Sequence, residues 1–175
     1  MHRLIPAALA ASLLAATAAV AAPAAPPPTD PQIAHIAYTA DQIDIASAKQ
    51  ALGITKNPAV REFANEMVRD HTAVNDKALA LVKKLHVTPE PNATSASLVK
   101  MADAKHKQLG ALSGAAFDRA YAQNEVAYHK AVNSALRTTL IPDAHNGELK
   151  SLLQTGLKLF EQHQAHAEQL AAQLK

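Results

Sequence analysis

Three histidines occupy positions where amphipathic helices normally carry apolar side chains. His71 lies one turn after Met67 and one turn before Val74, so its ring should point into a helix bundle. His129 and His163 interrupt two later apolar seams in the same way. A buried imidazole needs a partner, because burying an unpaired polar group is unfavourable. Since neutral imidazole is a common ligand of Zn, Cu and Fe, the pattern indicates either a metal site or a hydrogen-bonded polar layer.

Further residues with carboxylate or imidazole groups accompany these histidines, on the same helices or on the inner edge of an earlier one. They are Asp44, Glu66, Asp70, Glu125 and His166. We expect Asp44 to act as a ligand beside the three histidines. The others would be additional ligands, or outer partners that fix the tautomers of the ligating rings.

The positions of these residues along their helices predict that they meet. The apolar spacing indicates four long helices, over 31–52, 58–86, 114–141 and 147–175. Each candidate lies within about three residues of the centre of its helix, roughly 4.5 Å of axial rise. In helices packed side by side, Asp44, His71, His129 and His163 would therefore lie in one layer.

The connection between the second and third helices is long and predicts the topology. It contains a short helical pattern over 97–109, which Gly110 ends. One long crossover makes the second and third long helices parallel, as in ferritin-like bundles. The alanine-rich composition, with three Phe, three Tyr and no Trp, also favours close-packed helices. We therefore predict an all-α fold, a ferritin-like four-helix bundle with an extra helix in its crossover.

The N-terminal segment decides the expected compartment. Residues 1–22 show a basic start, an apolar stretch and a small-residue cleavage site ending at Ala21, which is the pattern of a secretory signal peptide. An uncleaved anchor is the alternative, but the stretch is barely long enough to span a bilayer. Residues 23–30 form a Pro-rich tether, and 31–175 form the bundle domain. We expect a periplasmic or secreted protein with no transmembrane segment after cleavage.

Composition and missing motifs exclude several classes of function. The formal charge is only +2 and the lysines alternate with acids, so no nucleic-acid footprint is present. The absence of cysteine excludes disulfides and thiolate metal sites. No nucleophile motif or Gly-rich phosphate loop occurs, so we assign no catalytic residue. The expected activity is binding rather than turnover.

Two runs of residues resemble an exported bacterial family of unknown function, DUF4142. One is FANEMVRDHTAVN from Phe63, and the other is LSGAAFDRAY over 112–121. The resemblance covers about 31–170 and implies a ferritin-like bundle without an established activity. By position, the family's inner acid, its Asp-His pair and its later histidines fall on Asp44, Asp70, His71, His129 and His163.

Three functional hypotheses follow. The first is one transition-metal ion, Zn, Cu or Fe, bound in the core for metal handling or envelope stress tolerance. The second is a metal-free envelope module whose polar core fixes packing while its surface engages an unknown envelope protein or the cell wall. The third is a di-metal oxidase, the weakest of them, because neither inner helix carries a Glu-x-x-His pair and Glu125 precedes His129 by four residues.

Overall fold

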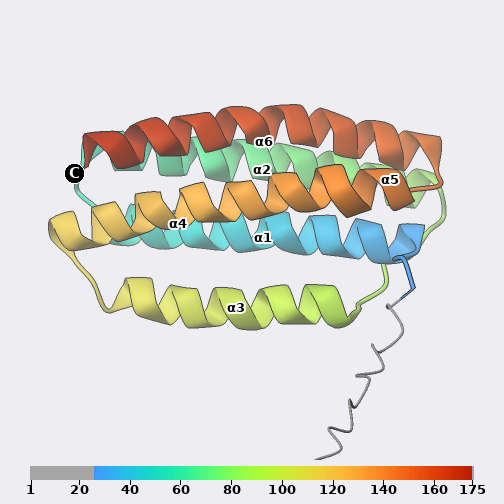
Figure 1. Ribbon diagram of the computed structural model, residues 1–175, viewed down its shortest axis with the longest axis horizontal. Helices are drawn as coiled ribbons and strands as arrows, with labels where there is room; N and C mark the ends of the chain where they lie inside the picture. Colours follow the sequence, from blue (N-terminus) through green and yellow to red (C-terminus); the bar gives the residue numbers. More distant parts are fainter. Residues whose placement is uncertain (1–25, 175) are drawn as a thin grey trace, which may run out of the picture.

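The computed structural model describes residues 26–174 as a bundle of long helices without strands. The predicted signal peptide and the first residues of the tether lie outside the described residues. The bundle consists of α1 (Asp30–Ile54), α2 (Pro58–Lys84), α4 (Gly114–Ala135) and α6 (Gly147–Gln173), with α3 (Ala93–Gly110) on its outside (Figure 1). In this part of the chain, no helix is long and apolar enough to cross a membrane.

The chain order and the directions of the helices match the ferritin-like topology. The most extensive contacts join α1 with α2 and α4 with α6, and α2 also packs against α6. Helix α3 runs back along α1, so α4 begins at the same end of the molecule as α2 (Figure 1). Helices α2 and α4 are therefore parallel. The predicted all-α ferritin-like bundle with a helical crossover is confirmed.

Side-chain caps explain where most of the helices begin. Asn57 accepts hydrogen bonds from the backbone N–H groups that open α2, and Asn146 does the same for α6. Helix α3 begins four residues earlier than predicted, because Asn92 and Ser95 form a reciprocal capping box that the sequence analysis missed. Helix α2 ends two residues earlier than predicted, before His86 takes a positive φ of 53°.

The predicted third helix is not a uniform α-helix. Helix α4 passes at Leu136 into a π-helical turn, η1 (Leu136–Leu140), and then into the short α5 (Ile141–Asp143). Pro142 therefore lies inside the helical stretch that it was expected to end. It is tolerated because it occupies the first turn of α5, where a missing N–H leaves no α-helical hydrogen bond unmade.

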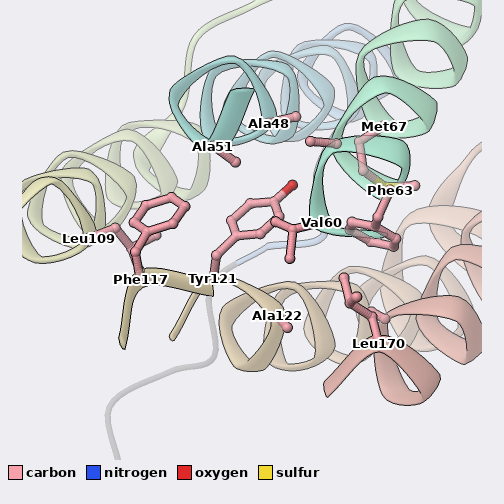
Figure 2. Packing of buried hydrophobic residues seen from close by; sticks show 12 residues of the cluster. Ala48, Ala51, Val60, Phe63, Met67, Leu109, Phe117, Tyr121, Ala122 and Leu170 are labelled. Atoms are coloured by element: carbon pink, nitrogen blue, oxygen red, sulfur yellow. The ribbon is translucent and has the colours of Figure 1, made fainter. Parts of the chain in front are cut away.

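The apolar core is divided into two clusters, one towards each end of the bundle. The first surrounds Phe63, Phe117, Tyr121 and Leu170, with the rings of Phe117 and Tyr121 stacked at 6.0 Å (Figure 2). The second lies at the opposite end and contains Ile33, Ile36, Leu136, Leu140, Ala144, Leu149, Leu153 and Phe160. Asp44, His71, His129 and His163 lie between the two clusters along their helices.

Truncation of the first cluster should destabilise the whole bundle. We expect Phe63→Ala to lower the free energy of unfolding by about 3–5 kcal/mol, because the ring is fully buried and leaves a cavity. Leu79→Ala is the control, since Leu79 is about half exposed and its truncation should change stability by less than about 0.5 kcal/mol. Urea denaturation followed by circular dichroism measures both. Equal effects would contradict this description of the core.

Candidate metal centre in the bundle core

Four polar side chains from four different helices meet between the apolar clusters. Asp44 comes from α1, His71 from α2, His129 from α4 and His163 from α6, and each is at most 2% exposed. The centroids of the three imidazole rings are 5.2, 5.5 and 5.7 Å apart. The rings thus form a nearly equilateral triangle, with the Asp44 carboxylate beside it.

One nitrogen of each imidazole is held by an oxygen acceptor. The pairs are His71 Nδ1 with Asp41 Oδ1 at 2.7 Å, His129 Nδ1 with the main-chain oxygen of Glu125 at 3.0 Å, and His163 Nε2 with Asp70 Oδ2 at 3.0 Å. Since a carbonyl or carboxylate oxygen can only accept, each of these nitrogens carries the hydrogen. The opposite nitrogen of a neutral ring then presents a lone pair.

Those opposite nitrogens are buried in the core. His129 Nε2 and His163 Nδ1 have no hydrogen-bond partner among residues 26–174, and His71 Nε2 is in contact with Asp44. The three histidines each offer a ligand atom, and these atoms lie within 4.8 Å of one another. Lone pairs gathered in this way repel unless a proton or a cation lies between them. A cation-binding arrangement is therefore what the donor set supports chemically.

Asp44 completes this set on the side of α1. Its Oδ2 lies 3.1 Å from His71 Nε2 and 3.3 Å from His129 Nε2. Two ligand atoms of a tetrahedral site with bonds of about 2.0–2.1 Å are about 3.3 Å apart, so these separations fit shared coordination of one ion. Its other oxygen, Oδ1, has no hydrogen-bond partner within the described residues.

Glu125 lies at the edge of the centre rather than among the three nitrogens. Its Oε1 accepts a hydrogen bond from Ser47 Oγ at 2.9 Å, while Oε2 is buried without a partner in the described part of the chain. Glu125 also groups with Asp44 and His129, with one ligand atom of each within 4.8 Å of the others. Burial raises the pKa of Glu125 well above its usual range. It can serve as an additional ligand for an ion held by Asp44 and His129.

Asp41 is a functional candidate that the sequence analysis missed. It lies three residues before Asp44 on the same face of α1, and its carboxylate fixes the Nδ1 hydrogen of His71. The two aspartates therefore contact the two nitrogens of one imidazole. The i, i+3 spacing of Asp41 and Asp44 was a signal that pointed to this role.

Glu66 and His166 do not join the core layer. His166 Nδ1 donates to Glu66 Oε2 at 2.6 Å on the outer side of α2 and α6, where both side chains are partly exposed. Asp70 lies between this pair and the core and contacts His163. Of the predicted outer partners, Asp70 thus fixes a core tautomer, whereas Glu66 and His166 form a separate contact.

The electrostatics of the layer differ from ring to ring. Burial lowers the pKa of His71, but Asp44 and Asp41 outweigh this effect and raise it to about 10. Burial lowers the pKa of His129 to about 4, with Asp44 opposing only part of the shift. Burial also lowers the pKa of His163. Without a bound ion, His71 therefore carries a hydrogen on both ring nitrogens at neutral pH, whereas His129 and His163 are neutral.

The raised pKa of His71 predicts a pH dependence for the ion-free protein. The folded-state pKa of about 10 exceeds the unfolded value of 6.5, so the stabilisation is complete below pH 6.5 and is lost as the pH rises through 10. Its size is on the order of 5 kcal/mol. In chelator, unfolding free energies at pH 6.5 and 10 should differ much less in Asp44→Asn than in the wild type.

The exposed Asp103→Asn is the matched control for this comparison and should keep the wild-type pH dependence. An Asp44→Asn protein with the same pH dependence as the wild type would contradict the assignment of the proton to His71.

Comparisons with known proteins agree with this architecture. A family model described as "Domain of unknown function (DUF4142)" matches residues 15–170. No curated protein matches significantly. A crystal structure of a DUF305 protein from Streptomyces coelicolor aligns with a TM-score of 0.69 and 15% identity, over 82% of this chain and 91% of that chain. That likeness shows the helical fold, and the family match shows that the chain belongs to the DUF4142 family.

Proposed function

We propose that this protein binds one transition-metal ion in its bundle core through His71, His129 and His163, with Asp44 as the fourth ligand. The observation that carries the proposal is the convergence of three buried imidazoles and the Asp44 carboxylate: the inner nitrogens of His129 and His163 have no hydrogen-bond partner among the described residues, and His71 Nε2 lies 3.1 Å from Asp44 Oδ2. Each ring is held through its other nitrogen by an oxygen acceptor, which is how proteins orient ligating histidines.

The donor set favours some ions over others. Three imidazole nitrogens and one carboxylate oxygen suit Zn, Cu or Fe, whereas Ca and Mg prefer sites made of oxygen alone. Apolar clusters lie on either side of the centre along the bundle, and the ring of Phe160 stacks on His71 at 4.6 Å. An enclosed ion with four protein ligands suits holding or delivering metal more than turnover. We therefore propose metal handling or tolerance of envelope stress as the role.

The proposed location is the periplasm or the exterior of the cell. Its support is the signal-peptide pattern of residues 1–22. The DUF305 protein of similar fold is itself named as a candidate secreted protein, which agrees with this location without establishing it.

The second candidate function is a metal-free envelope module with a polar core. It is favoured by the position of His71 between Asp41 and Asp44, because a protonated ring between two carboxylates needs no metal. It leaves the inner nitrogens of His129 and His163 unexplained, since neither has a hydrogen-bond partner in the described residues. This candidate predicts that chelator leaves the melting temperature unchanged.

The third candidate, a di-metal oxidase, would need a second ion held by Asp44, Glu125 and His129. Two ions would then share His129 and Asp44, which leaves each with few ligands. It predicts two metals per chain and oxygen-dependent oxidation of Fe(II), and a stoichiometry of one metal excludes it.

Elemental analysis tests the proposal directly. Untagged mature protein purified from the periplasm should contain about one metal ion per chain, and removing it should lower the melting temperature, because an ion at 100 times its Kd stabilises by about 2.7 kcal/mol. The triple variant His71→Ala, His129→Ala, His163→Ala should contain none. A single His129→Ala variant provides a folded comparison if the triple variant is too unstable.

The matched control replaces three histidines outside the core, His35→Ala, His106→Ala and His145→Ala, and should keep the metal. Absence of metal from the wild type, or its retention in the core variants, would contradict the proposal.

A further inference from the structure

A row of side chains that can bind a cation leads from the surface to the core along the contact between α2 and α6. We call Glu66, Asp70 and His166 the outer cluster. Exposure of their side chains falls steadily inwards, from 39% at His166 to 27% at Glu66 and 18% at Asp70. The row ends at His163, whose side chain is fully buried. The cluster therefore joins solvent to one of the proposed core ligands.

The contacts in this row are close enough for shared binding of an ion. His166 Nδ1 lies 2.6 Å from Glu66 Oε2, and His163 Nε2 lies 3.0 Å from Asp70 Oδ2. Glu66, Asp70 and His163 each offer a ligand atom, and these atoms lie within 4.8 Å of one another. His166 is not part of this group of three but contacts Glu66, so the outer cluster and His163 together form a mixed set of carboxylates and imidazoles, which is the chemistry that binds transition metals.

The charge of the outer cluster is negative. Glu66 and Asp70 contribute two carboxylates, and the opposing cation in contact with them is Arg69, whose Nε lies 2.7 Å from Asp70 Oδ1. The side chain of Arg69 is 69% exposed, so water screens much of its charge. Carboxylates at the mouth of a path raise the local concentration of cations.

His163 connects the outer cluster with the core. Its Nε2 faces Asp70, while its Nδ1 faces the core and has no hydrogen-bond partner in the described part of the chain. One imidazole thus belongs to both groups of potential ligands, since the core set and the outer set each include it. An ion held near Asp70 would lie beside the Nε2–H of this ring, whereas the lone pair on Nδ1 is available to the ion only from the core side.

A second route towards the core is poorer in ligands. A cavity of about 1040 Å³ has walls formed mainly by apolar side chains of α1, α2, α3, α4 and α6. Asp41 and Ser47 line it, but most of its surface has no group that could replace the water around a cation. Stripping water from an ion without new ligands is unfavourable.

We propose that Glu66, Asp70 and His166 form an outer cation site that captures a divalent transition metal and passes it along His163 to the core, where the ion meets the Nδ1 lone pair of that ring. This inference rests on the proposed function, because it describes how the core centre is loaded. It assigns the outer cluster a kinetic role that is separate from the final ligands. The outer site binds more weakly than the core, since its residues are partly hydrated.

The loading rate of the metal-free protein tests the outer site. With Co²⁺ as the probe, the visible absorption of the tetrahedral core complex reports arrival of the ion. The double variant Glu66→Gln, His166→Gln should load at least about tenfold more slowly, as expected when a steering charge and capture ligands are lost. Its final stoichiometry should remain one ion per chain, because neither residue lies in the core.

The control is the double variant Glu168→Gln, His106→Gln, which removes the same residue types from exposed positions and should load at the wild-type rate. A wild-type rate in Glu66→Gln, His166→Gln would overturn the outer site while leaving the core centre intact. Absence of a core complex in the wild type would instead refute the proposed function, so the two failures are distinguishable.

Equilibrium binding tests the outer site without the core. A His71→Gln, His129→Gln protein lacks two core ligands but keeps the outer cluster, and it should still bind Co²⁺ weakly in dialysis. Adding Glu66→Gln should abolish this residual binding, whereas adding Glu168→Gln should not. Residual binding that is absent, or that Glu66→Gln leaves unchanged, would overturn the proposal.

Discussion

The structure depends on how a layer of polar groups is accommodated in the middle of an otherwise apolar bundle. Three imidazoles and two aspartates lie there at no more than 4% exposure. Each buried polar atom without a hydrogen-bond partner destabilises the fold by roughly a few kcal/mol. Such a layer therefore persists only if the protein or a bound ligand supplies the missing partners. The protein supplies an oxygen acceptor for the outer nitrogen of each ring. The inner nitrogens are left to bind a proton or an ion.

Because the inner nitrogens are left to a proton or an ion, the layer can link folding to metal binding. Each of α1, α2, α4 and α6 contributes one inner group, so one ion would connect all four helices of the bundle. The inner ligands are distant in sequence and are brought together only by the fold. Binding free energy at such a centre is also folding free energy. The apolar clusters on either side hold the layer at a fixed height and keep water away from it.

The sequence predicted the architecture because its signals are periodic and local. Apolar spacing located the long helices, and the length of the crossover determined that α2 and α4 are parallel. The common height of Asp44, His71, His129 and His163 followed from counting residues along straight helices. The depth of the remaining acids depends on the rotation of each helix and on rotamers. For that reason Asp41 was missed, and Glu66 and His166 were expected nearer to the core than they lie.

Other features could not be read from the sequence for similar reasons. The π-helical turn η1 arises where α4 continues into a segment that contains Pro142. We expected this proline to end the helix, but proline is permitted in the first turn of a helix, which is where Pro142 lies. The early start of α3 depends on a cap between Asn92 and Ser95 within a weakly apolar stretch. The π-helical turn and the start of α3 are both local backbone conformations that depend on tertiary contacts.

X-ray absorption spectroscopy of the natively loaded protein tests the central claim most directly, because it reports the atoms bound to the ion. We expect a first shell of three nitrogens and at least one oxygen at about 2.0–2.1 Å, with the outer-shell scattering that imidazole rings produce. The His129→Ala variant should lose one imidazole contribution. A spectrum without imidazole scattering, or one that is the same in the variant, would contradict coordination by the core histidines.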